Sequence, residues 1–199
     1  MCNGNKKLLI TGFDPFGGET INPSWEAVRR LPEQIGSFAL TKLQIPTQFD
    51  RAAQMVLRVA ETQKPDVILA VGQAGGRSGI TPEVVAINLR EASIADNAGY
   101  CPSNVPVVSG GPDGYFSTVP VRAMVAAIRK EGIPSALSYS AGAFVCNDVL
   151  YSLLHAFSGT ATQVGFVHVP YLPEQAKEGV PSLSLEQMVA ALTVAIEAM

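Results

Sequence analysis

The residue with the clearest chemical potential is Cys146, in the stretch Ser140-Ala-Gly-Ala-Phe-Val-Cys-Asn147. Small residues there give way to an apolar periodic run that predicts an amphipathic helix over 144–157. A cysteine at a helix start meets unsatisfied N–H groups and the positive end of the helix dipole, which favour the nucleophilic thiolate. Buried cysteines are more often small apolar side chains, so this position alone leaves a packing role open.

Histidine is the usual base for a cysteine nucleophile, and the chain contains two of them. His155 follows Cys146 after a rotation of about 900°, which places it on the opposite side of a regular helix. We therefore expect His155 to be a surface or packing residue. His168 lies at the end of the predicted strand 163–169, where it can face the start of the cysteine helix. A buried structural histidine is the competing interpretation.

A third group should orient the imidazole and stabilise its charged form, and the sequence offers two carboxylates for this role. Glu83 opens an apolar segment, where a carboxylate is costly unless it has a partner. Asp96 belongs to an Asp-Asn-Ala-Gly stretch and is more simply an ordinary turn residue. At this level both candidates stay open.

The composition restricts the partners. The 199 residues are 47% hydrophobic and 16% charged, as in a well-packed α/β protein. A net charge of −3 without a basic cluster argues against nucleic acid and acidic membranes. The three cysteines have no C-x-x-C spacing that would indicate a metal or redox site. No signal peptide or membrane span is recognisable, so we expect a cytoplasmic protein that acts on a small molecule, a peptide or a protein.

Hydrophobic periodicity predicts alternating strands and helices along one domain, residues 1–199. The predicted strands cover 8–12, 38–45, 66–71, 83–89, 136–139 and 163–169. The predicted helices cover 24–31, 52–60, 119–129, 144–157 and 184–198, the last capped by Ser184 with Glu186 in its first turn. The Gly- and Pro-rich stretch 93–118 is expected to be a long loop or arm.

This alternation predicts an α/β fold of the α/β/α sandwich type, with a mainly parallel or mixed twisted sheet covered by helices on both faces. Ligands of such sheets gather at the carboxyl ends of the strands. The loops after Ile10 and Val71, and those near Cys146 and His168, are expected to lie at that edge.

Several motifs resemble the signatures of the pyroglutamyl peptidase I family, also called pyrrolidone-carboxylate peptidases. They occur in the family's order and spacing over most of the chain: Thr11-Gly-Phe-Asp-Pro-Phe-Gly-Gly18, Gly72-Gln-Ala-Gly-Gly-Arg77, Gly114-Tyr-Phe-Ser-Thr-Val-Pro120, Ser140 to Asn147, and Gly165-Phe-Val-His-Val-Pro-Tyr171.

The resemblance implies a cysteine peptidase that removes an N-terminal 5-oxoproline (pyroglutamate) from peptides through a thioester. Carried over by position, it implies Cys146 as nucleophile, His168 as general acid and base, and Glu83 as the residue that orients the histidine. It also implies a homo-oligomer, a tetramer or a dimer, and no metal or organic cofactor.

Pyroglutamate is an uncharged lactam, so its site needs an apolar slot and a few polar groups matched to the amide. Phe13 and Phe16 supply the slot by this resemblance, although such a pair alone more often packs a loop into the core. Gln73 and Asn22 can each donate and accept a hydrogen bond, the alternatives being an exposed glutamine and a turn-capping asparagine. Arg77, like Asp96, is a possible supporting residue.

A few positions depart from the family pattern. Ala143 stands where threonine is common, and Asp148 where histidine is frequent; helical phase predicts that the Asp148 charge points away from Cys146. Ser93 and Ala95 replace an arginine and a proline, which removes a cation near the expected site and loosens a turn. The alternative function is therefore a catalytically weakened homologue that binds pyroglutamyl groups without efficient turnover.

Overall fold

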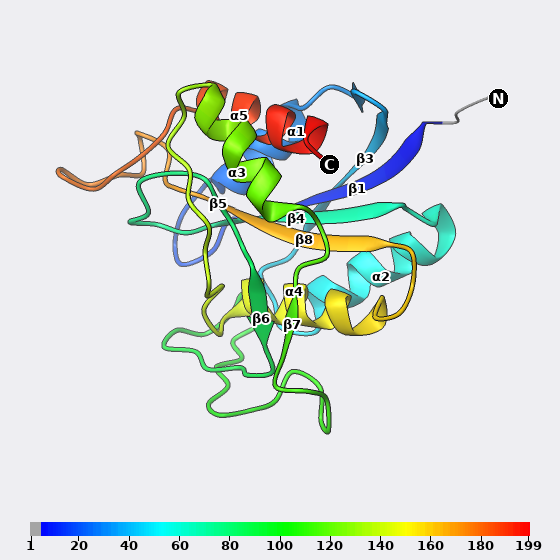
Figure 1. The fold of residues 1–199 in the computed structure, drawn as a ribbon. Helices are drawn as coiled ribbons and strands as arrows, with labels where there is room; N and C mark the ends of the chain where they lie inside the picture. The colour runs from blue at the N-terminus through cyan, green and yellow to red at the C-terminus, as the bar shows by residue number, and fades with distance from the viewer. Residues whose placement is uncertain (1–4) are drawn as a thin grey trace.

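A six-stranded sheet lies at the centre of the computed structural model, which describes residues 5–199 and so leaves Cys2 outside (Figure 1). Its strands are β1 (Lys6–Phe13), β2 (Gln34–Ile35), β3 (Phe38–Ile45), β4 (Val67–Gln73), β5 (Thr81–Pro82) and β8 (Gln163–Val169). Their order is β2-β3-β1-β4-β8-β5. The four inner strands are parallel, whereas β2 and β5 add antiparallel edges.

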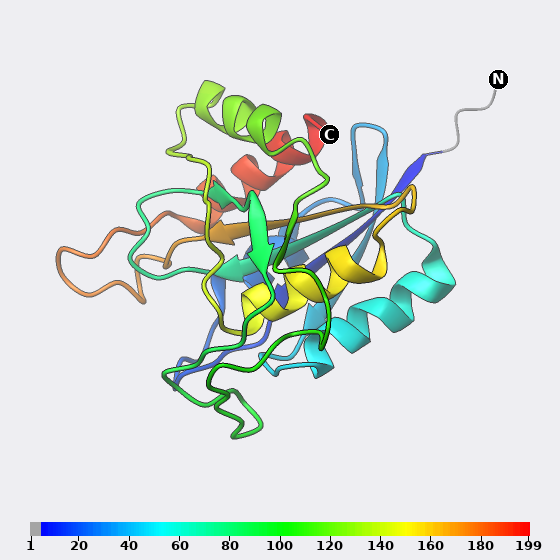
Figure 2. The same cartoon turned by 60° about the horizontal axis from the view of Figure 1, so that its bottom comes forward.

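Within residues 5–199, five helices cover the two faces of this sheet. One layer contains α1 (Pro23–Arg30), α3 (Val121–Lys130) and α5 (Leu185–Glu197), and the opposite layer contains α2 (Arg51–Gln63) and α4 (Val145–Ala156). Figures 1 and 2 show the two layers on opposite sides of the strands. The predicted α/β/α sandwich with a mixed sheet is therefore confirmed.

The inner strands are apolar on both faces because helices cover both. Along β1, Leu8 and Ile10 face the α1–α3–α5 layer, whereas Leu9 and Phe13 face the α2–α4 layer. Strand β4 is buried from Val67 to Gly72 and emerges only at its end. The same alternation thus fills both cores and delivers Phe13 to the carboxyl edge, where the loops begin.

The predicted cap of the last helix is confirmed. Ser184 and Gln187 form a reciprocal capping box at the start of α5, with Glu186 in its first turn. At the start of α1, Asn22 accepts the N–H of Ser24 and Pro23 occupies the first turn.

Two of the predicted strands were wrong in extent or type. The segment 83–89 pairs only as β6 (Val85–Ile87), in a separate antiparallel ribbon with β7 (Gly114–Phe116), which lies inside the stretch expected to be a loop. The segment 136–139 forms no strand; it makes one isolated bridge, from Ser138 to Glu83, and a second bridge joins Ser135, just before it, to Ile80. Pro82 lies between those two bridges and has no N–H to donate, which interrupts a continuous ladder.

Within residues 5–199, no helix combines the length and the apolar character that a membrane crossing requires.

Candidate active site

A buried histidine–carboxylate pair lies at the carboxyl edge of the sheet. His168, on β8, is 3% exposed, and Glu83, between β5 and β6, is fully buried. The Nδ1 atom of His168 is 2.6 Å from Oε1 of Glu83. Because an ionised carboxylate only accepts hydrogen bonds, Nδ1 carries the proton and Nε2 keeps a lone pair. The imidazole is thus held in the tautomer that can accept a proton.

Arg77 completes the surroundings of this carboxylate. Its Nη1 atom donates to Oε1 of Glu83 at 2.8 Å, and its Nη2 atom donates to the Ser140 carbonyl at 3.1 Å. Oε2 of Glu83 has no hydrogen-bond partner within residues 5–199. Burial raises the pKa of Glu83, but His168, Ser138 and Arg77 together outweigh it and hold that pKa below its usual value. Glu83 is therefore ionised at neutral pH.

The same burial keeps His168 neutral. Desolvation lowers the pKa of His168 below its usual value, and the positive charge of Arg77 lowers it further, against the opposing pull of Glu83. A neutral imidazole whose Nδ1–H is held by Glu83 is the form that a general base requires.

Cys146 lies in the first turn of α4 and is a half-buried residue. Burial, and after it the negative charge of Glu83, raises the pKa of the thiol to about 12, although Arg77 and the backbone N–H of Cys146 act in the opposite direction. The helix start does favour the thiolate, as expected, but desolvation outweighs it, so the side chain is a neutral thiol. A thiol in this position needs a neighbouring base to become a nucleophile.

Gly72 allows the sulfur to lie against the sheet. A Cβ atom at this position would be 2.9 Å from Sγ of Cys146 and 2.7 Å from Cζ of Phe166. We expect Gly72→Ala to displace the thiol and to lower kcat/KM by roughly a hundredfold, since misplacing reacting groups by about 1 Å has an effect of that order. Steady-state kinetics at a temperature well below the melting transition would measure it.

Gly165→Ala is the matched control for that substitution. Its Cβ atom would clash with Cγ2 of Val119 at 2.3 Å, so the fold is strained without any contact to the thiol. An equal loss of activity in both variants would refute the specific role of Gly72.

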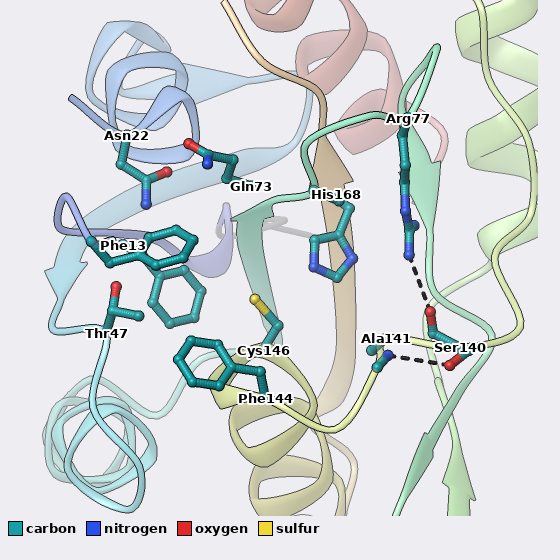
Figure 3. Close-up of a pocket in the computed structure, with 13 residues that line it drawn as sticks. Phe13, Asn22, Thr47, Gln73, Arg77, Ser140, Ala141, Phe144, Cys146 and His168 are labelled. Atoms are coloured by element: carbon teal, nitrogen blue, oxygen red, sulfur yellow. Dashed lines mark hydrogen bonds between the residues drawn. The ribbon is translucent and has the colours of Figure 1, made fainter. Parts of the chain in front are cut away.

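Cys146 and His168 open into a cavity of about 310 Å³, at the lower end of the size range of small-molecule sites. It is lined by Phe13, Phe16, Asn22, Thr47, Gln73, Ala74, Arg77, Ser140, Ala141, Gly142, Phe144, Cys146 and His168. Figure 3 shows the sulfur between an aromatic chamber on one side and the imidazole on the other. Arg77 and Ser140 lie beyond the imidazole, on the side away from the chamber.

Three phenylalanines shape the chamber. Phe13 is buried at the end of β1, and Phe16 and Phe144 also line the cavity, with their ring centroids 6.2 Å apart. Thr47 closes the space below Phe13; its N–H donates to Oδ1 of Asp14 at 2.6 Å. The structure therefore brings together the two phenylalanines predicted from the sequence and adds a third ring from the cysteine helix.

Two amide side chains lie at the other end of the chamber (Figure 3). Gln73 ends β4, and its oxygen accepts a weak hydrogen bond of 3.3 Å from Gln175. Asn22 is 2% exposed, accepts the N–H and hydroxyl of Ser24, and donates to the carbonyl of Asp14. Both predicted residues line the cavity, but the Asn22 amide is largely occupied in capping α1 and holding the Phe13–Phe16 loop.

Two further sequence candidates lie away from His168. Asp96 accepts the N–H groups of Phe49, Ala98 and Tyr100, so it is the turn-forming residue and Glu83 is the partner of the histidine. His155 is exposed at the far end of α4, where Nδ1 lies 2.8 Å from the Tyr115 hydroxyl; its predicted surface and packing role is confirmed.

Sequence reasoning missed Thr47, Ala74, Phe144 and the Ser140–Gly142 segment as parts of the cavity wall. Phe144 could have been predicted as a lining residue, because it is an aromatic residue two positions before Cys146. Thr47 could not, because it reaches the site only through the pairing of β3 with β1.

Of the departures from the family pattern, Ser93 and Ala95 are exposed and neither lines the cavity. Ala143 is half-buried, and its carbonyl accepts the N–H of Glu91. The carboxylate of Asp148 turns away from the cavity toward Arg90, as helical phase predicts.

Residues 5–199 contain no group of three or more His, Cys, Asp or Glu side chains placed to hold a metal ion. In this part of the chain, Cys101 and Cys146 are both free, and Cys101 is exposed.

An α/β/α sheet that presents a partly exposed cysteine beside a carboxylate-held histidine defines an enzyme of the cysteine hydrolase class. The model of the pyroglutamyl peptidase family matches residues 6–199. The chain belongs to the pyroglutamyl peptidase family.

Individual relatives agree with this assignment. The pyrrolidone-carboxylate peptidase of Levilactobacillus brevis is 52% identical over 196 residues, which cover 96% of each chain. That of Thermococcus onnurineus is 48% identical over 194 residues, or 96% of this chain and 97% of the relative. These relatives are named as peptidases, and none supports the alternative of a binding protein without turnover.

Solved structures of the family have the same fold. The crystal structure of pyroglutamyl peptidase I from Bacillus amyloliquefaciens superposes with a TM-score of 0.94 at 46% identity and covers 98% of this chain and 94% of its own. The pyrrolidone carboxyl peptidase of Thermococcus litoralis gives 0.92 at 37% identity, with coverage of 97% and 92%.

Proposed function

We propose that this protein is an omega-peptidase that hydrolyses the N-terminal pyroglutamyl residue from peptides through a thioester on Cys146. The observation that carries the proposal is the Glu83–His168 pair at the edge of an aromatic chamber that is lined by no aspartate or glutamate among the described residues and that also holds the sulfur. The chamber suits a small neutral lactam, and the named peptidases among the relatives support the same substrate class.

The reaction begins with a proton transfer. Nε2 of His168 takes the thiol proton as the sulfur of Cys146 forms a bond to the pyroglutamyl carbonyl carbon. The imidazolium is stabilised by Glu83 and then protonates the leaving amine as the C–N bond breaks, which leaves a thioester. The same histidine deprotonates water, whose oxygen attacks the thioester carbonyl carbon; as the C–S bond breaks, the imidazolium returns the proton to sulfur and the free acid is released. The proposed chemistry needs no metal or organic cofactor.

The start of α4 supplies donors for the oxyanion. The helix has no side-chain cap, and the N–H groups of residues 145–147 make no backbone hydrogen bond within the described chain. They belong to the same turn as the sulfur, so they can bind the oxygen of a carbonyl that the sulfur attacks.

Substrate selection follows from what the chamber contains. Gln73 offers an amide that can pair with the lactam N–H and carbonyl, while Phe13, Phe16 and Phe144 contact the ring. None of the described lining residues is an aspartate or a glutamate. An ordinary N-terminal ammonium would therefore be desolvated without an anionic partner, which is energetically costly.

Other elements support the proposed site less directly. Arg77 donates hydrogen bonds to Glu83 and to the Ser140 carbonyl, so it fixes the position of the carboxylate relative to the loop that leads to Cys146. Asn22 fixes the Phe13–Phe16 loop. We further propose that the chain forms one peptidase domain, works in the cytoplasm and assembles into a homo-oligomer, a tetramer or a dimer.

Two fluorogenic substrates test the proposed specificity. We expect efficient hydrolysis of L-pyroglutamyl-aminocoumarin and a kcat/KM at least about 10³-fold lower for L-prolyl-aminocoumarin, which has the same ring size but a charged amine. The difference reflects the cost of burying an unpaired charge, and each factor of ten corresponds to about 1.4 kcal/mol. Comparable rates on both would refute the chamber argument, and no hydrolysis of the pyroglutamyl substrate would refute the peptidase proposal.

A further inference from the structure

The first turn of α4 carries two fully buried polar side chains directly after Cys146, and the mechanism above uses neither. Asn147 accepts the N–H of Ile87 at 3.0 Å and donates to its carbonyl at 2.9 Å. Asp148 accepts the backbone N–H of Asp50 at 3.0 Å. These contacts join the start of the nucleophile's helix to β6 on one side and to the start of α2 on the other.

Arg90 ties Asp148 and Asp50 together. Its Nε atom donates to Oδ1 of Asp148 at 2.6 Å, and its two Nη atoms donate to the two carboxylate oxygens of Asp50 at 3.1 and 2.5 Å. Burial lowers the pKa of Arg90, but the two carboxylates outweigh burial and raise it above its usual value. We refer to Asp50, Arg90 and Asp148 as the Arg90 cluster.

The cluster also fixes an unusual backbone conformation. Asp50 has a φ of 56°, in the region that favours glycine, and it provides no side-chain cap for α2. Its carboxylate is bound to Arg90 and its N–H to Asp148 instead. Non-glycine residues keep such a conformation only where surrounding contacts impose it.

Phe49 connects the Arg90 cluster to the wall of the cavity. Its ring lies 5.8 Å from the Arg90 guanidinium and packs edge-on against Phe144, with ring centroids 5.3 Å apart. Phe144 lines the cavity, whereas Phe49 and the three members of the cluster do not. The cluster therefore supports the aromatic wall from behind.

We propose that the Arg90 cluster is a positioning device for the reaction. It fixes the first turn of α4, which carries Cys146, and, through Phe49, the ring of Phe144 against which the lactam packs. The cluster touches neither the substrate nor the reacting atoms, so it acts through the wall and the helix. This inference rests on the proposed function, because it concerns the binding of the pyroglutamyl group.

Asp50→Asn and Asp148→Asn test the cluster by steady-state kinetics with pyroglutamyl-aminocoumarin. We expect kcat/KM to fall roughly tenfold, with most of the change in KM, because a shifted wall weakens ring binding more than proton transfer. Inhibition by free 5-oxoproline should weaken by the same factor as KM. Arg90→Lys keeps the positive charge but should raise KM as the two carboxylate variants do, since an ammonium group cannot engage both carboxylates as a planar guanidinium does.

The control for a merely structural effect is Leu192→Ala, in the buried face of α5 on the other side of the sheet. It should lower Tm while leaving KM and 5-oxoproline inhibition unchanged. The Asp50 side chain is 58% exposed, so Asp50→Asn should fold. If Asp148→Asn fails to fold, the test of the proposal rests on Asp50→Asn.

Wild-type KM in a folded Asp50→Asn protein would overturn the positioning role, as would an equal KM shift in Leu192→Ala. An inactive wild-type enzyme would instead refute the proposed function, so the two failures are distinguishable.

Discussion

Replacing Cys146 with serine is expected to abolish turnover of pyroglutamyl-aminocoumarin, with kcat reduced by at least about 10⁴-fold. The Cys146 thiol is already held in its neutral form, with a pKa raised to about 12 by burial, so attack depends on proton transfer to His168. A hydroxyl is a weaker acid and a weaker nucleophile than a thiol. The His168 base, whose pKa is lowered by desolvation, cannot compensate for that difference.

Measuring the binding of 5-oxoproline distinguishes a variant that lacks only the nucleophile from one whose binding site is damaged. Serine is nearly isosteric with cysteine, so Cys146→Ser should bind 5-oxoproline as wild type does in isothermal titration calorimetry. Cys101→Ser is the matched control, because Cys101 is exposed and lies outside the cavity lining. Substantial activity in Cys146→Ser, or its loss in Cys101→Ser, would contradict the assignment of the nucleophile.

The sequence predicted the parts of the fold that follow from local patterns. Strands β1, β4 and β8 are apolar runs buried on both faces, and helical phase alone separated His155 from the cysteine's side of α4. The segment 136–139 has a strand-like composition, but its pairing depends on Pro82, more than fifty positions earlier. The hydrophobic pattern within a segment does not show which distant segment it will pair with in the fold.

The same limit applied to the site. The family resemblance implied Glu83, but the residue pattern alone left Glu83 and Asp96 open. Their distinction rests on a contact that spans 85 positions in the chain, and the pairing of β5 with β8 brings Glu83 to His168. The protonation state of Cys146 could not be predicted for a related reason. A helix start is visible in sequence, whereas the burial that outweighs it is a property of the assembled cavity.

Glu83→Gln is expected to lower kcat by a factor on the order of 10³ to 10⁴. Glutamine fills the same space, but its amide does not stabilise the imidazolium that forms during acyl transfer, and it does not enforce the proton on Nδ1 of His168. Glu83→Asp keeps the charge on a shorter side chain and should retain an intermediate activity. Loss of the 2.6 Å contact alone then accounts for the remaining defect.

The pH profile distinguishes this role from simple destabilisation. His168 must be neutral to accept the thiol proton, so activity is present above its pKa and is lost as the pH falls through it. That pKa is lowered by desolvation, while the hydrogen bond and charge of Glu83 partly raise it again. Removing Glu83 therefore moves the acid limb of kcat/KM to lower pH even as the plateau falls. A plateau that falls while the acid limb stays in place would mean that Glu83 does not set the protonation of His168.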